Sequence, residues 1–153
     1  MADPQDIFAW QRLDARTTTS GHLTVADLDR LAALGVGHVI NLALDSAPRA
    51  LADEGALLAE RGIAYTHIPV PFEAPDETHF AAFREALDAY PDAPLHVHCM
   101  MNWRVSAFFY RYHRDVAGMP EPEARALMET QWSPTASDDP RAPAWAAFIE
   151  RRG

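Results

Sequence analysis

The stretch PLHVHCMMNWRVSAFFYRYH, residues 94–113, combines side chains that can perform nucleophilic chemistry. Cys99, the only cysteine of the chain, ends a strand-like run, and four residues separate it from Arg104 at the start of a helix-like segment. The first amides of a helix lack intrahelical partners and carry the positive end of its dipole, which favours a thiolate and attracts oxyanions. A guanidinium can bind two oxygens of a phosphoryl or sulfuryl group at once. The stretch therefore predicts a thiolate nucleophile aimed at an anion, with Arg104 as a ligand of that anion.

Each of these two residues also has a simpler interpretation. A lone cysteine at a strand end is usually a packing residue, because free cysteine is among the most buried residue types. Arg104 by itself would be taken as a surface residue of the helix that follows it. The strand–loop–helix context of the pair favours the anion site over both simpler interpretations.

The elements that position this stretch are predicted from hydrophobic spacing and from turn residues. Thr24 or Ser20 can cap a first helix that ends at the glycines of residues 35–37. Strand-like segments then alternate with helical ones, which predicts a single α/β domain over residues 1–153, with a mostly parallel sheet of about four to five strands flanked by helices. The predicted strands are 38–44, 63–70 and 95–99, and the further predicted helices are 46–62, one within 75–94, 104–117, 121–132 and 142–152.

Composition and charge exclude several classes of protein. The formal net charge of −9 argues against a nucleic-acid binder, which needs a basic face. No run approaches the 18 or so apolar residues of a membrane span, and the first residues show no secretory signal. A single cysteine makes no internal disulfide and fits a reducing compartment, so a cytoplasmic location is predicted.

The segment VHCMMNWRVS, residues 97–106, resembles the active-site loop of the cysteine-dependent protein tyrosine and dual-specificity phosphatases. The pattern of that superfamily is His-Cys, five residues, Arg, and then Ser or Thr. Upstream, residues 19–46 resemble the early helix and strand of bacterial dual-specificity-like members, and residues 65–89 resemble their strand, acid loop and helix. The likeness spans residues 17–116 or so.

This resemblance implies a mechanism and a class of substrate. Cys99 would attack phosphorus to form a cysteinyl-phosphate, Ser106 would assist the thiolate, and water would hydrolyse the intermediate. The substrate would be a phosphorylated protein or a small phosphomonoester, and no metal or organic cofactor is implied. The equatorial oxygens of the phosphoryl group would be held by Arg104 and by the amides of Met100, Met101, Asn102 and Trp103.

The loop departs from the family pattern in two respects. Four residues separate Cys99 from Arg104 where the family has five, so Val105 takes the arginine position in the family's register. The loop also has no glycine, and Asn102 is then the residue best able to supply a left-handed backbone conformation. Trp103 could form a wall of the pocket, but we expect it to serve mainly as an anchor of the loop.

The family also uses an acid that protonates the leaving group, and residues 71–77 offer Glu73, Asp76 and Glu77 for it. Asp76 stands where the N-cap of the third helix belongs, and this capping role is favoured over catalysis. Glu73 lies in a more loop-like position, although glutamate is not the usual acid there. Both residues are kept as candidate general acids.

Two further functions compete with phosphatase activity. Cys, four residues and Arg is the loop length of rhodanese-type sulfurtransferases, in which the thiolate carries a persulfide. The chain lacks the Asp-Val-Arg strand of that family, which places this function second. The third possibility is a catalytically inactive phosphatase fold that binds a phosphorylated partner, for which Arg104 and the loop amides would be needed but Cys99 would not.

Overall fold

The computed structural model describes residues 2–152 and has a five-stranded sheet at its centre. The strand order is β1-β2-β5-β3-β4, and only the pairing of β1 with β2 is antiparallel. The predicted single-domain α/β fold with a mostly parallel sheet is therefore confirmed. The strands are β1 (Gln11–Arg12), β2 (Thr17–Ser20), β3 (His38–Asn41), β4 (Ala64–His67) and β5 (Leu95–His98).

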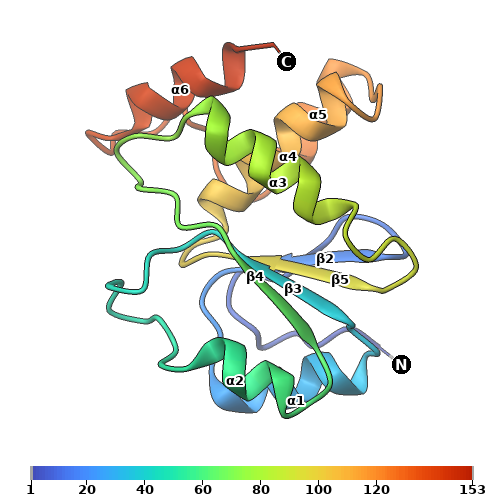
Figure 1. The fold of residues 1–153 in the computed structure, drawn as a ribbon. Helices are drawn as coiled ribbons and strands as arrows, with labels where there is room; N and C mark the ends of the chain where they lie inside the picture. The colour runs from blue at the N-terminus through green and yellow to red at the C-terminus, as the bar shows by residue number, and fades with distance from the viewer. Residues whose placement is uncertain (1, 153) are drawn as a thin grey trace.

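Six helices cover the two faces of the sheet (Figure 1). They are α1 (Val25–Ala33), α2 (Glu54–Ala59), α3 (Glu77–Leu87), α4 (Trp103–Asp115), α5 (Glu121–Glu129) and α6 (Ala142–Glu150). Figure 1 shows α1 and α2 on one face and α3 to α6 on the other, and each face has its own cluster of buried apolar side chains. Within residues 2–152, no helix is both long enough and apolar enough to cross a membrane.

Two parts of the fold differ from the sequence-based expectation. β1 and β2 were not predicted, and the helix expected over residues 46–62 is reduced to α2. That helix cannot begin earlier because Asp53 has a left-handed backbone conformation with φ of 58°. Residues 46–53 consequently form a loop near the carboxyl end of the sheet, and part of this loop lines the candidate site described below.

The alternation of side chains along β5 explains its two histidines. Leu95 and Val97 point into the large core beneath α3 to α6. His96 faces the opposite layer, where its ring nitrogens lie 2.8 Å from the hydroxyls of Thr18 and Ser20. Burial lowers the pKa of His96 well below its ordinary value, with the neighbouring His98 adding to the effect. These buried polar groups satisfy one another, so His96 is a structural residue.

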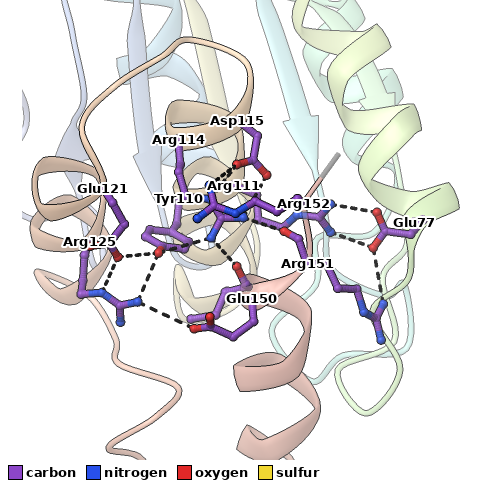
Figure 2. A network of polar contacts seen from close by, with 11 residues as sticks. Glu77, Tyr110, Arg111, Arg114, Asp115, Glu121, Arg125, Glu150, Arg151 and Arg152 are labelled. Atoms are coloured by element: carbon purple, nitrogen blue, oxygen red, sulfur yellow. Dashed lines mark hydrogen bonds and ion pairs between the residues drawn. The ribbon is translucent and has the colours of Figure 1, made fainter.

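A network of charged residues fixes the C-terminal helix to the rest of the domain (Figure 2). Arg114 of α4 donates to the carbonyls of Ile149 and Arg151 at 2.8 and 2.6 Å, which satisfies free carbonyls at the end of α6. Arg111 is fully buried and donates two hydrogen bonds of 2.8 Å to the carboxylate of Glu77 at the start of α3. Held in this way at its C-terminal end, α6 extends its first residues toward the end of the sheet where the candidate site lies.

The ion pair of Glu77 with Arg111 predicts a measurable pH dependence of stability. Its hydrogen bonds to Arg111, more than any other interaction, keep the pKa of Glu77 below the ordinary value of 4.5. A carboxyl group with such a lowered pKa stabilises the fold above its unfolded-state pKa and loses this contribution as the pH falls through the folded-state value. We therefore expect the free energy of unfolding to fall more steeply between about pH 5 and pH 3 in the wild-type protein than in Glu77→Gln.

The size of this effect is limited by solvent. Because the Glu77 side chain is 52% exposed, the two proteins should differ by about 1 kcal/mol or less at neutral pH. Urea unfolding at a series of pH values would measure it. Glu123→Gln is the matched control, since Glu123 is also an exposed residue in the first turn of a helix but forms no ion pair within residues 2–152. Parallel curves for the wild type and Glu77→Gln would contradict the prediction.

Candidate active site

The candidate nucleophile lies at the carboxyl end of the central strand. Cys99 directly follows β5, and the loop of residues 99–102 connects it to the first turn of α4. In open parallel sheets this edge is where ligands bind, because the N-termini of the following helices point there. The strand–loop–helix arrangement predicted around Cys99 is confirmed.

Asn102 shapes the loop that has no glycine. Its φ is 66° and its ψ is 11°, so it supplies the left-handed conformation predicted for it. Its buried side chain donates to the carbonyl of Ala9 and the hydroxyl of Thr19 at 2.9 and 3.0 Å, and it accepts a hydrogen bond of 3.1 Å from Ser106. These three contacts compensate for the cost of a left-handed, non-glycine residue. The hydroxyl of Ser106 is thus directed to Asn102.

The segment after β2 supports the loop from one side. The amide of His22 donates to the carbonyl of Met100 at 2.9 Å, which turns that carbonyl toward the support. A side chain on Gly21 would not fit, because a Cβ there would lie 2.6 Å from the same carbonyl oxygen. The segment that follows β2 therefore fixes the carbonyl of Met100, and this contact does not involve the amides of the loop.

The backbone amides of the loop and of the first helical turn are free. Within residues 2–152, none of the N–H groups of residues 100–105 has a hydrogen-bond acceptor. The start of any helix leaves some amides unpaired, but here residues 100–102 of the preceding loop extend the set. Six consecutive free amides next to a thiol provide the donors that an oxyanion requires.

Arg104 lies close to Cys99 and is largely buried. Its Nε donates to the carbonyl of Val70 at 3.0 Å, and its Cζ is 5.3 Å from the centre of the Phe72 ring. Burial lowers the pKa of Arg104, while the neighbouring Cys99 acts in the opposite direction. The carbonyl of Val70 holds one edge of the guanidinium, so the Nη atoms are available to bind an anion.

A cleft of about 240 Å³ opens beside this loop. Trp103, which stacks on Trp132 at 4.7 Å, both anchors the loop and forms a wall of the cleft. Cys99 is fully buried beneath the loop, so a phosphoryl group can reach its Sγ only when the surrounding side chains move apart. The cleft is lined by Ala47, Pro48, Phe72, Met100, Met101, Trp103, Arg104 and Arg141.

The two candidate general acids occupy different surroundings. Asp76 is the N-cap of α3, and its Oδ1 accepts hydrogen bonds from the amides of Thr78 and His79, as its position in the sequence predicted. Hydrogen bonds, first of all from the Thr78 side chain, lower the pKa of Asp76. Glu73 is exposed, and its charge interacts with both Arg104 and Arg141. Of the two carboxyl groups, Glu73 is the one whose charge interacts with the guanidinium groups that line the cleft.

Two features of the site were not predicted from the sequence. Arg141, at the start of α6, brings a second guanidinium to the cleft. On the opposite face of the sheet, Nε2 of His98 lies 2.6 Å from the carboxylate of Glu54, while its Nδ1 lies 3.3 Å from the carbonyl of Cys99. A carbonyl only accepts hydrogen bonds, so Nδ1 is the donor in that contact, and the ring connects Glu54 of α2 to the residue that carries the thiol.

Comparison with known proteins relates the fold of this chain to solved structures. No protein-family model and no curated protein matches the chain. Among solved structures, a candidate phosphatase (DUF442) from Shewanella putrefaciens CN-32 is 32% identical, with a TM-score of 0.83 over 95% of this chain and 93% of that chain.

Two more distant structures have the same fold. TpbA from P. aeruginosa, in complex with pTyr, is 17% identical, with a TM-score of 0.69 over 97% of this chain and 93% of that chain. PTPMT1, in complex with PI(5)P, is 14% identical, with a TM-score of 0.71 over 92% of this chain and 94% of that chain. The fold of the chain is that of the cysteine-based phosphatases, and at 32% identity to the Shewanella protein the chain belongs to the DUF442 family of phosphatase-like proteins.

Proposed function

We propose that this protein is a cysteine-dependent phosphatase that hydrolyses a phosphomonoester through a cysteinyl-phosphate on Cys99. The observation that carries the proposal is the set of free amides of residues 100–105, which surround the start of α4 next to the thiol and the guanidinium of Arg104. Preorganised donors of this kind stabilise the charge that develops on a phosphoryl group during transfer.

The reaction proceeds in two displacements at phosphorus. The thiolate of Cys99 attacks, the S–P bond forms, and the ester P–O bond breaks. Glu73 gives its proton to the leaving oxygen, a role supported by the interaction of its charge with Arg104 and Arg141, which both line the cleft. Water then attacks the phosphorus, Glu73 accepts the proton of that water, and the S–P bond breaks to release phosphate. No metal or organic cofactor takes part in this scheme.

The structural neighbours support a phosphomonoester substrate. TpbA was solved with pTyr and PTPMT1 with PI(5)P, so the same fold accommodates both an aryl phosphate and a phosphorylated inositol headgroup. We propose a phosphorylated protein side chain, such as phosphotyrosine or phosphoserine, or a small phosphomonoester as the substrate of this chain.

The burial of Cys99 favours one alternative, an inactive phosphatase fold that binds a phosphorylated partner. Such a binder would use Arg104 and the loop amides without ever exposing the thiol. The two functions differ in one observable, which is whether a covalent bond to Cys99 ever forms.

Mass spectrometry of acid-quenched single turnovers separates these functions. With an aryl phosphate, we expect a transient phosphoryl group on the peptide that contains Cys99, formed together with the phenol. A parallel incubation with thiosulfate and cyanide tests sulfur transfer, in which a persulfide on Cys99 and thiocyanate would appear. Absence of both adducts in a folded protein that still binds vanadate would refute the phosphatase proposal and favour the binder.

A further inference from the structure

We propose that Arg141 binds a second acidic group of the substrate, so that the cleft selects phosphomonoesters whose leaving group carries a further phosphate or carboxylate. This inference rests on the proposed function, because it requires the phosphoryl group to lie at Arg104 and the loop amides. The proposed function does not specify the leaving group of the phosphomonoester, and this inference adds a preference for leaving groups that carry a second acidic group.

The two guanidinium groups share one aromatic ring of the cleft. The Cζ atoms of Arg104 and Arg141 lie 5.3 and 4.4 Å from the centre of the Phe72 ring. The sum of the two distances sets an upper limit of about 10 Å on the separation of the two Cζ atoms. The charge of Arg141 also contributes to the lowered pKa of Arg104, after the larger effect of burial. The positive groups are therefore near enough for one small molecule to touch both.

Arg141 keeps hydrogen-bonding capacity for a ligand. Its Nε and Nη2 donate to the carboxylate of Asp139 at 3.0 and 2.9 Å, which fixes the orientation of the guanidinium. Within residues 2–152, Nη1 has no hydrogen-bond partner, and the side chain is 50% exposed. A guanidinium has a second edge for bidentate binding, and here that edge is available to a phosphate or carboxylate.

The wall between the two guanidinium groups is apolar. Phe72, Trp103 and Met101 line the cleft, and Met101 is 43% exposed. An aromatic or short aliphatic spacer can pack on these side chains while its two ends reach Arg104 and Arg141. The negative charge of Glu73 also acts on Arg141, so a second acidic group needs direct hydrogen bonds to the free edge of this guanidinium to bind here.

The test compares three substrates that differ only in the group opposite the phosphate: phenyl phosphate, 4-carboxyphenyl phosphate and benzene-1,4-bisphosphate. We expect kcat/KM of the wild type to favour the acidic substrates by about tenfold, as a charged hydrogen bond at a half-exposed site can provide. In Arg141→Met this preference should disappear. Arg30→Met is the matched control, because Arg30 is 41% exposed and lies in α1 on the other face of the sheet. It should keep the preference.

A binding measurement separates failure of this inference from failure of the proposed function. Calorimetry on Cys99→Ser gives the affinities for the same three compounds without turnover, with and without Arg141→Met. A preference that depends on Arg141 in binding, but no hydrolysis by the wild type, would retain the inference and overturn the phosphatase. Equal values of kcat/KM for the three substrates in an active wild type, or a preference that survives Arg141→Met, would overturn the inference alone.

Discussion

Replacing Cys99 by serine is expected to lower kcat for phosphomonoester hydrolysis by about four to six orders of magnitude, as the loss of a catalytic nucleophile does in other enzymes. An alcohol is far less acidic than a thiol, so the free amides that can stabilise a thiolate cannot generate an equivalent alkoxide. The chain has no second cysteine, so no neighbouring thiol can replace the missing one. Steady-state release of phenol and phosphate measures the effect.

The same variant should leave the anion site intact. Serine is nearly isosteric with cysteine, and both Arg104 and the amides of residues 100–105 remain in place. Binding of inorganic phosphate, followed by calorimetry, should therefore change by less than about threefold. Unchanged hydrolysis in Cys99→Ser would refute the covalent mechanism, and loss of both activity and phosphate binding would indicate a damaged loop and require Cys99→Ala as a second variant.

The parts of the site that could be predicted are those with local causes. Asp76 caps α3 because a short carboxylate before a helix reaches the free amides of the next turn, and this signal lies within four residues. Asn102 takes the left-handed conformation because the loop contains no glycine and asparagine tolerates that conformation best among its residues. The order of strands and helices follows in the same way from hydrophobic spacing.

The parts that could not be predicted depend on contacts between distant residues. The Thr-rich strand β2 has no apolar alternation, and it is a strand because it pairs with β5 and because Thr18 and Ser20 satisfy His96. Arg141 reaches the cleft because Trp145 donates to the carbonyl of Phe72 and Arg114 holds the other end of α6, and no spacing within residues 133–145 indicates this. Propensity along the chain does not contain such information.

The short loop becomes consistent with an anion site once its surroundings are included. With four residues between Cys99 and Arg104, the arginine stands in the first turn of α4, where its Nε reaches the carbonyl of Val70. The hydrogen bond to Val70, in the segment that follows β4, therefore fixes the position of the guanidinium. The loop therefore does not need the fifth residue to bring the charge to the thiol, and Val105 is left to pack in the core.

Arg104→Lys is expected to lower kcat/KM by about two to three orders of magnitude, as the loss of one preorganised oxyanion donor does in other enzymes. Lysine keeps the positive charge, but it cannot hold the carbonyl of Val70 and bind two phosphoryl oxygens at the same time. The inhibition constant of vanadate should rise in parallel, because the same contacts bind the ground-state anion and the transition state. Competitive inhibition assays measure it.

Arg111→Lys provides the matched comparison for this last prediction. Arg111 is also a buried arginine of α4, two turns further along, but it pairs with Glu77 outside the cleft. Its replacement should reduce the free energy of unfolding, because the paired hydrogen bonds to Glu77 and the contacts of the guanidinium with the rings of Phe80 and Phe148 are lost. It should leave the vanadate inhibition constant unchanged, because none of these residues lines the cleft. If Arg104→Lys binds vanadate as tightly as Arg111→Lys does, the guanidinium of Arg104 serves the packing of residues 70–72, and the anion is held by the loop amides alone.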